Sequence, residues 1–556
     1  MPDPEETEVA AGGAKAKLKK HNIRTSTAVF MVFSLVAAGA YGIESMIPES
    51  GPGLTLVILM VLPFIWGLPF GLVTSELGSV RPQEGGYYKW VQEALGEFWG
   101  FQAGWWRTVS IYIDNTLYVI LAAGYISAQW DIGPAAEFAL KAAMILIFMY
   151  INLRGIKDVG AITNILSVFV IIAFAMIAVI GFLNWRQNPF VPFTPEPAET
   201  SVDWIFYIGA GISVGMWMYS GYESMSTIAG ELENPQVIPK ATLITVPLIV
   251  ATYIFPTMGG LASMGLWEEW GEGADAVGYA DVAATYLGYG AGAFFIIVAV
   301  IAQCSIYNTY IASGSRGFFA LAEDNLAPPV LVKVDKKYGV PYAAVISIAA
   351  VNLILCNFAF KTVVIVDVFL LVASYILVYI SCVILRRRIP EKEYKFRIPG
   401  GYGFLRLLCV APICVALVSF MINGTDFFIG GMAGIISGPV MYVVWRKMYG
   451  GLSRKNPAAY PQNPLTGLGE GDVRHMSVMF LILGAIGVAG RVFLQWYESG
   501  WAYDYYPEEY KTGFLSDWDA MLASILIVAI LCFALAAACF LISGKVEKIA
   551  VRTVQR

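Results

Sequence analysis

Fourteen apolar stretches, each about long enough to cross a bilayer, constrain the fold of this 556-residue chain more than any other feature. A membrane-spanning helix needs about 20 mostly apolar residues. The chain is also 58% hydrophobic and only 14% charged. We therefore expect an all-α integral membrane protein with spans near residues 25–48, 54–79, 94–128, 136–153, 160–184, 204–230, 240–266, 284–318, 342–360, 363–386, 404–423, 427–447, 475–496 and 518–543. The pair 342–360 and 363–386 would merge if no turn occurs near Lys361.

The distribution of Lys and Arg predicts which side of the membrane each loop faces. With the N-terminus inside, 30 of the 36 basic residues fall on the cytoplasmic side. The outer loops are acidic instead, as in "WEEWGEGAD" and "YDYYPEEY". The polar first ~20 residues lack the apolar core of a signal peptide, so they predict a cytoplasmic tail. We expect a multi-pass protein of the plasma or inner membrane with both termini in the cytoplasm.

A short sequence echo suggests that the chain contains two copies of one unit. "GIESM" begins at Gly42 in the first span, and "GYESM" begins at Gly221 in the sixth. These two spans run in opposite directions, and inverted repeats are a recurring design in secondary transporters. The predicted organisation is an N-terminal tail (1–24), inverted repeat one (25–184), inverted repeat two (204–386), four additional spans (404–447 and 475–543) and a C-terminal tail (544–556).

Glycines accompany a glutamate in each copy of the echo. Glycine destabilises a helix interior by about 1 kcal/mol relative to alanine, so Gly39, Gly42 and Gly221 favour breaks in spans one and six. Unwound backbone must face protein, water or ligand rather than lipid. Glu44 and Glu223 would then supply negative charge to a bound ammonium group. The alternative is that both glutamates only hydrogen-bond the broken helices together and that the echo is chance.

Further polar groups lie inside the predicted spans. Asp114 and Asn115 interrupt span three, where an Arg107–Asp114 bridge is the alternative to a binding role. Tyr307 and Asn308 in span eight either contact a ligand or join helices to each other. Trp217 and Tyr219 precede Glu223 by about one turn, and such a ring can cap an ammonium group through a cation–π contact.

Composition argues against several other kinds of protein. A net charge of −5 does not favour nucleic acid as a partner. Only two histidines and no CxxC pair are present, so we expect no metal centre, no Ser-His-Asp triad and no enzymatic activity. No phosphate-binding GxxxxGK[ST] motif occurs, and we expect no cofactor. A sensor would require an additional soluble domain, and a channel would show measurable conductance. The longest segment between spans, near 448–473, is rich in Pro and Gly, so we do not expect it to fold as a separate domain.

Three segments carry a family resemblance. They are "PQEGGYYKWVQEALGEFWGFQAGW" (82–105), "GYESMSTIAGELENPQVIPKA" (221–241) and "SGSRGFFALAEDNLAPP" (313–329). They resemble the amino acid–polyamine–organocation superfamily, and "GIE", "FIWGLP" and "YIDNTLY" are most similar to its polyamine and cationic amino acid uptake branch. The resemblance implies a leucine-transporter-type fold, two inverted five-helix repeats plus four additional helices, and transport by alternating access.

The resemblance also assigns expected roles to individual residues. Trp217 falls where the family has a gating aromatic residue, and Asn115 and Asn308 match polar positions near the substrate. Glu223 matches an acid beside the broken sixth helix, and Gly42-Ile43 matches the end of a Gly-Ser-Gly-Ile element. The predicted substrate site therefore comprises Gly39, Ala40, Tyr41, Gly42, Ile43, Glu44, Asp114, Asn115, Trp217, Tyr219, Ser220, Gly221, Tyr222, Glu223, Tyr307 and Asn308.

Two departures from the family pattern bear on the substrate. Ala40 and Tyr41 replace the first Gly and the Ser of the Gly-Ser-Gly-Ile element, and Glu44 occupies a usually apolar position. A carboxylate there would repel a substrate carboxylate by roughly 4 kcal/mol at 4 Å and an effective dielectric of 20. We therefore expect a cationic, polyamine-like amine; the alternative is a broad-range or neutral amino acid permease or exchanger.

The second departure concerns coupling to protons. Some proton-coupled members have a lysine in the middle of span five, but no lysine occurs between Asp158 and Arg186 here. A buried carboxyl group can exchange a proton near neutral pH. Glu44, Asp114 and Glu223 are therefore the candidate proton-coupling residues.

Overall fold

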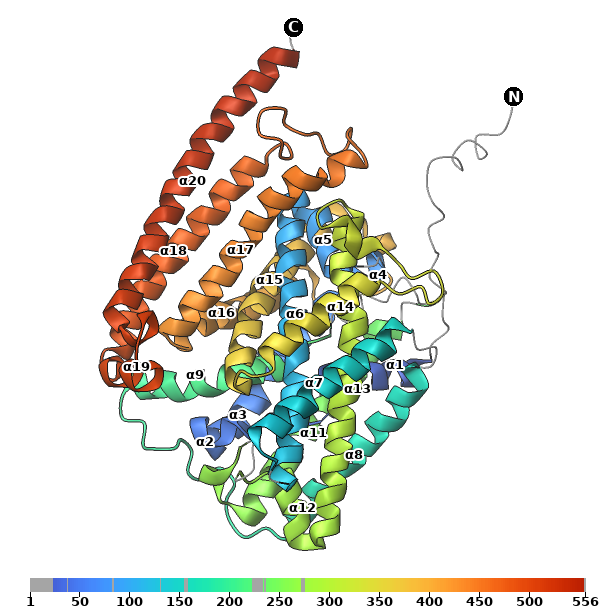
Figure 1. The fold of residues 1–556 in the computed structure, drawn as a ribbon, viewed down its shortest axis with the longest axis vertical. Coiled ribbons are helices and arrows are strands. Elements are labelled where there is room, and N and C mark those ends of the chain that lie inside the picture. The colour runs from blue at the N-terminus through green and yellow to red at the C-terminus, as the bar shows by residue number, and fades with distance from the viewer. Residues whose placement is uncertain are drawn as a thin grey trace.

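The computed structural model describes residues 24–554 except 38, 83–84, 131, 155–158, 223–233, 235–236 and 272–275, and within this part it is helical without strands (Figure 1). Ten of the described helical segments are long and apolar enough to cross a membrane. Three shorter apolar helices, Thr25–Ser34, Ser167–Leu183 and Tyr342–Leu355, match further predicted spans. With Ser201–Met218 they account for all fourteen predicted spans.

The first five spans and the next five form two matching series of helices. The first series is α1 (Thr25–Val36) with α2 (Met46–Ser50), α3 (Pro52–Leu62) with α4 (Leu68–Val80), α5 (Gly86–Leu95), α6 (Glu97–Trp130), α7 (Pro134–Leu153) and α8 (Val159–Leu183). The second is α9 (Ser201–Met218), α11 (Val237–Met264), α12 (Tyr279–Leu287), α13 (Tyr289–Glu323), α14 (Tyr342–Leu355) and α15 (Phe360–Arg388). A turn at residues 356–359 separates α14 from α15, so these two spans do not merge.

The two series also share a feature that was not predicted from the sequence. A short helix, α5 or α12, precedes the longest helix of each series, α6 of 34 residues or α13 of 35. Each short helix ends at a glycine with positive φ, Gly96 at 96° and Gly288 at 89°. Glycine adopts this backbone conformation without steric strain, so it lets the chain turn directly into the long helix.

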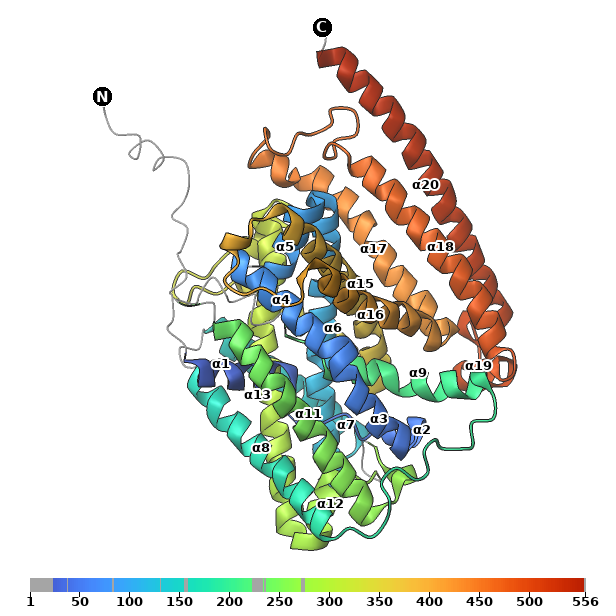
Figure 2. The same cartoon turned by 180° about the vertical axis from the view of Figure 1, so that it is seen from behind.

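The remaining helices lie at one edge of the molecule. They are α16 (Gly401–Ile422), α17 (Thr425–Tyr449), α18 (Asp472–Glu498), α19 (Ala502–Tyr510) and α20 (Trp518–Val554). In both views α18 and α20 run side by side and form the outermost layer, with α19 joining them at one end (Figures 1 and 2). These helices therefore flank the two repeats and leave the broken spans inside the bundle.

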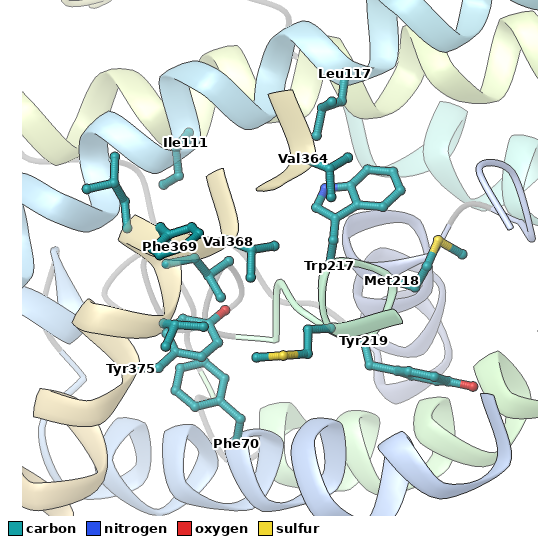
Figure 3. Packing of buried hydrophobic residues seen from close by; sticks show 14 of the residues in the cluster. Phe70, Ile111, Leu117, Trp217, Met218, Tyr219, Val364, Val368, Phe369 and Tyr375 are labelled. Carbon is teal, nitrogen blue, oxygen red and sulfur yellow. The ribbon is translucent and has the colours of Figure 1, made fainter. Parts of the chain in front are cut away.

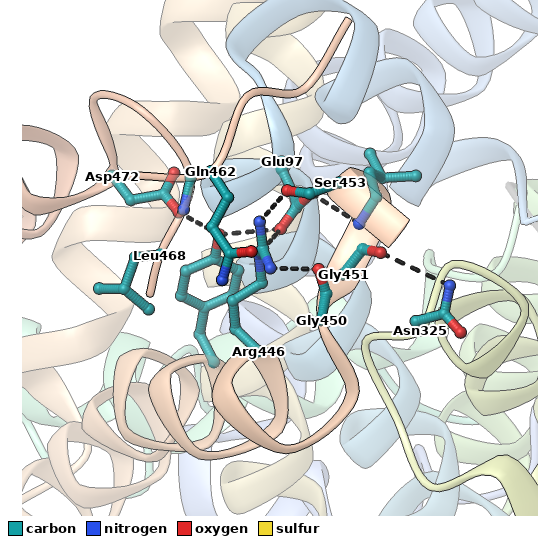
Figure 4. A network of polar contacts seen from close by, with 12 residues as sticks. Glu97, Asn325, Arg446, Gly450, Gly451, Ser453, Gln462, Leu468 and Asp472 are labelled. Atoms are coloured by element: carbon teal, nitrogen blue, oxygen red, sulfur yellow. Dashed lines mark hydrogen bonds and ion pairs between the residues drawn. The ribbon is translucent and has the colours of Figure 1, made fainter. Parts of the chain in front are cut away.

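Two buried ion pairs tie distant helices together. Arg386 of α15 donates from Nε to Glu76 of α4 at 2.8 Å. Arg446 of α17 pairs with Glu97 at the start of α6 at 2.6 Å, and Figure 4 shows its guanidinium between Glu97 and Gly450. The buried acids Glu76 and Glu97 are therefore each paired with an arginine from another helix.

Candidate substrate site

Spans one and six are both interrupted where the sequence predicts a break. Helix α1 ends at Val36, and α2 begins only at Met46; between them Gly39 and Gly42 have φ values of 116° and 92°. Helix α9 begins with a capping box in which Thr200 and Asp203 bond to each other's backbone N–H groups, and it ends at Met218. Gly221 follows with φ of 105°. The interruptions are therefore confirmed, but Glu223 lies outside the described residues.

The unwound part of span one contacts the last turn of α9. A Cβ atom on Gly42 would lie 3.0 Å from the ring of Phe360 and 3.3 Å from that of Trp217. The Phe360 and Trp217 rings meet edge to face with centroids 5.5 Å apart. Position 42 therefore requires a glycine for two reasons: the backbone has positive φ, and the Phe360 and Trp217 rings pack against it. Nothing in the sequence pattern singled out Phe360, because its role depends on how α15 packs.

Trp217 connects this contact to the polar residues of α6. Its indole Nε1 donates to Asp114 Oδ1 at 2.7 Å, and its ring lies 6.0 Å from that of Tyr118. Figure 3 shows Trp217 projecting from the end of α9 toward Leu117 and Val364. The structure thus joins three predicted site residues, Gly42, Trp217 and Asp114, in one continuous set of contacts.

Glu44 is completely buried beside the break in span one. Its carboxylate accepts from the Tyr125 hydroxyl at 2.8 Å and from the backbone N–H of Gly42 at 3.0 Å. Within the described residues, no lysine, arginine or histidine forms an ion pair with Glu44. This distinguishes Glu44 from Glu76 and Glu97, which are also buried but have arginine partners.

The carbonyl groups at the end of α9 are bound by protein side chains. Trp66 Nε1 donates to the Met216 carbonyl at 3.1 Å, and the Tyr253 hydroxyl donates to the Met218 carbonyl at 2.9 Å. The N–H of Gly221 donates to the Tyr375 hydroxyl at 3.4 Å, and the Tyr219 hydroxyl donates to the Leu59 carbonyl at 2.8 Å. The main-chain groups at this break therefore face protein, which is one of the three environments expected for them.

Three other predicted site residues have buried polar atoms with no hydrogen-bond partner among the described residues. These atoms are both amide atoms of Asn115 and the hydroxyls of Tyr41 and Tyr222. Buried polar groups normally have a hydrogen-bond partner, so these atoms are available to bind a water molecule or a substrate. Ala40, Ile43 and Ser220 are buried around the same two breaks.

The remaining predicted residues lie in contacts between helices. The Tyr307 hydroxyl donates to Asn352 Oδ1 of α14 at 3.0 Å, and Asn308 Oδ1 accepts from Asn152 of α7 at 2.7 Å. These bonds fit the alternative in which Tyr307 and Asn308 join helices. A role for Tyr307 or Asn308 in substrate binding remains a prediction. On α6, Arg107 donates to the Ser110 hydroxyl at 2.8 Å.

Comparison with known proteins identifies the family. The model of the amino acid permease family matches residues 23–447. The chain belongs to the amino acid permease family. The match ends with α17, so α18, α19 and α20 of this permease lie beyond the matched part.

Curated relatives cover most of the permease. Polyamine transporter RMV1 of Arabidopsis thaliana is 29% identical over 74% of this chain and 83% of its own length. Probable polyamine transporter At1g31830 of the same plant is 31% identical over 75% and 83%. The serine/threonine exchanger SteT of Bacillus subtilis is 26% identical over 72% and 90%. The relatives are transporters and not enzymes, and the permease is a multi-pass membrane transporter of the amino acid and polyamine class.

A solved structure supports the fold independently. The crystal structure of MhsT in complex with L-phenylalanine matches with a TM-score of 0.55 at 13% sequence identity, over 73% of this chain and 99% of MhsT. The leucine-transporter-type fold implied by the sequence resemblance is therefore confirmed.

Proposed function

We propose that this permease carries cationic, polyamine-like amines across the plasma or inner membrane by alternating access, with both termini in the cytoplasm. The observation that carries the proposal is the position of Glu44, a fully buried acid beside a broken span without a basic partner among the described residues. A buried uncompensated carboxylate is destabilised by several kcal/mol. A substrate ammonium group would remove that penalty on binding.

Asp114 provides a second acid for the same substrate. It is 3% exposed and binds the indole of Trp217, which in turn packs against Gly42. An ammonium group at Glu44 and another near Asp114 would match a diamine or polyamine. Trp217 would cover one of them, because an indole ring attracts a desolvated cation by about 2 kcal/mol.

Proton coupling follows from the same arrangement. When no substrate is bound, a proton is the simplest way to neutralise a buried carboxylate. Glu44 and Asp114, together with Glu223 outside the described residues, are the groups that we propose for this role, and no cofactor is required. Putrescine uptake into proteoliposomes should then increase with an inward proton gradient, and uptake unaffected by a protonophore would contradict the coupling.

A broad-range or neutral amino acid permease is the second candidate. Its support is the similarity to the serine/threonine exchanger and the bond from Gly42 N–H to Glu44, which stabilises the broken helix whether or not a substrate is present. In that case Glu44 would be structural, and substrate carboxylates would be tolerated.

Uptake by the reconstituted protein distinguishes the two candidates. We expect putrescine and arginine to be taken up in preference to serine, and Glu44→Gln to reduce putrescine uptake at least tenfold. Glu498→Gln is the matched control, because Glu498 is also fully buried but lies in α18 and accepts from Thr425 and Trp518. Preference for serine, or equal loss in both variants, would support the alternative.

A further inference from the structure

Two arginines from different helices share one tyrosine ring at the basic end of the bundle. The guanidinium carbon of Arg387, near the end of α15, lies 4.4 Å from the ring centroid of Tyr402. That of Arg406, in α16, lies 4.7 Å from the same centroid. A cation–π contact at an exposed site is weak, so the ring holds the two like charges together without neutralising them.

The neighbouring acids are occupied by other arginines. Glu391 pairs with Arg397, and Glu393 pairs with Arg81. In the part of the chain that the structure describes, no carboxylate forms an ion pair with Arg387 or Arg406. This end of α15 and α16 therefore carries two uncompensated positive charges.

Apolar side chains continue from these arginines along the same helix faces. On α16, Val410 and Leu417 follow Arg406 by four and eleven residues, spacings that keep them on one face. They are 53% and 39% exposed. On α15, Ile380 precedes Arg387 by seven residues and is 38% exposed. Figure 2 shows α16 on the outside of the molecule, and it packs against α15.

We propose that Arg387, Tyr402 and Arg406 bind the phosphate headgroup of an anionic phospholipid whose acyl chain lies along the exposed apolar face of α15 and α16. The charge is complementary, and a guanidinium fork matches phosphate oxygens in geometry. The exposed apolar side chains beyond the arginines favour a lipid over free phosphate as the ligand. The site lies on the side that the positive-inside rule assigns to the cytoplasm, where anionic lipids are concentrated.

Lipid binding to the purified full-length protein tests the site. Phosphatidylglycerol would be titrated in detergent, and bound lipid would be counted by native mass spectrometry. The double variant Arg387→Gln/Arg406→Gln should bind roughly thirtyfold more weakly, because each basic residue near an anionic surface contributes about a factor of five. The matched control is Lys447→Gln/Arg454→Gln, which removes two exposed charges from the same side without a shared ring.

Three outcomes would overturn the proposal. The control variant could lose as much binding as the test variant, or the test variant could bind like wild type. Inorganic phosphate could also raise the melting temperature of the protein in phosphatidylcholine vesicles as much as added phosphatidylglycerol does. That result would assign the site to free phosphate. The variant Arg387→Lys/Arg406→Lys keeps the charge but loses the forks, so we expect intermediate affinity even if the glutamine variant folds poorly.

Discussion

Removing Arg446 should destabilise the protein more than removing any exposed charge. Arg446 is fully buried, and its partner Glu97 is 7% exposed, so Arg446→Met leaves a buried carboxylate without its opposite charge. Glu97 would keep only the Tyr442 hydroxyl at 3.1 Å and the Leu452 N–H at 2.9 Å as donors. Breaking a buried ion pair on one side costs about 3–5 kcal/mol. We expect this loss in the free energy of unfolding, measured by circular dichroism in mixed micelles of increasing SDS fraction.

The double variant tests the reason for that loss. Glu97→Gln/Arg446→Met removes both charges and keeps one acceptor oxygen, which can serve either Tyr442 or Leu452, so it should recover part of the stability. Arg454→Met, an exposed control, should change stability by less than about 0.5 kcal/mol. The reasoning would be refuted if Arg446→Met lost less than about 1 kcal/mol or if the double variant were no more stable than the single one.

Other predictions address the break in span one and the basic surface. Gly42→Ala should abolish transport, because φ of 92° and the ring of Phe360 at 3.0 Å exclude a Cβ atom; Gly430→Ala, where nothing lies within 4 Å, should transport normally. For Asp324, burial raises the pKa, but the ion pairs with Lys89 and Lys455 and the bond from Tyr88 lower it below its ordinary value. Its stabilising effect should therefore be complete above about pH 4 and lost as pH falls further, so that wild type and Asp324→Asn converge in melting temperature at low pH.

The fourteen spans and the two interruptions were predictable because they depend on local properties. Span length, apolar composition and glycine placement are all present in the sequence between Thr25 and Val554. The satisfaction of the α9 carbonyls by Trp66 and Tyr253 was not predictable, since those donors come from helices 150 and 35 residues away in the chain. The same reason explains why Phe360 was missed.

Polar residues inside spans gave a mixed result. Asp114 and Trp217 were predicted to line the same site, and the two share a hydrogen bond. Tyr307 and Asn308 have the same polar character, but their bonds lead to α14 and α7. Residue type alone did not distinguish these cases, because the direction of a side chain from α6 or α13 depends on which helix packs against it.

The central claim is that Glu44 supplies the negative charge that binds a substrate ammonium group. Isothermal titration of putrescine into purified wild type, Glu44→Gln and Glu498→Gln tests it most directly. The account predicts that Glu44→Gln weakens binding at least tenfold and that Glu498→Gln binds like wild type. Wild-type affinity for putrescine in Glu44→Gln would contradict the account.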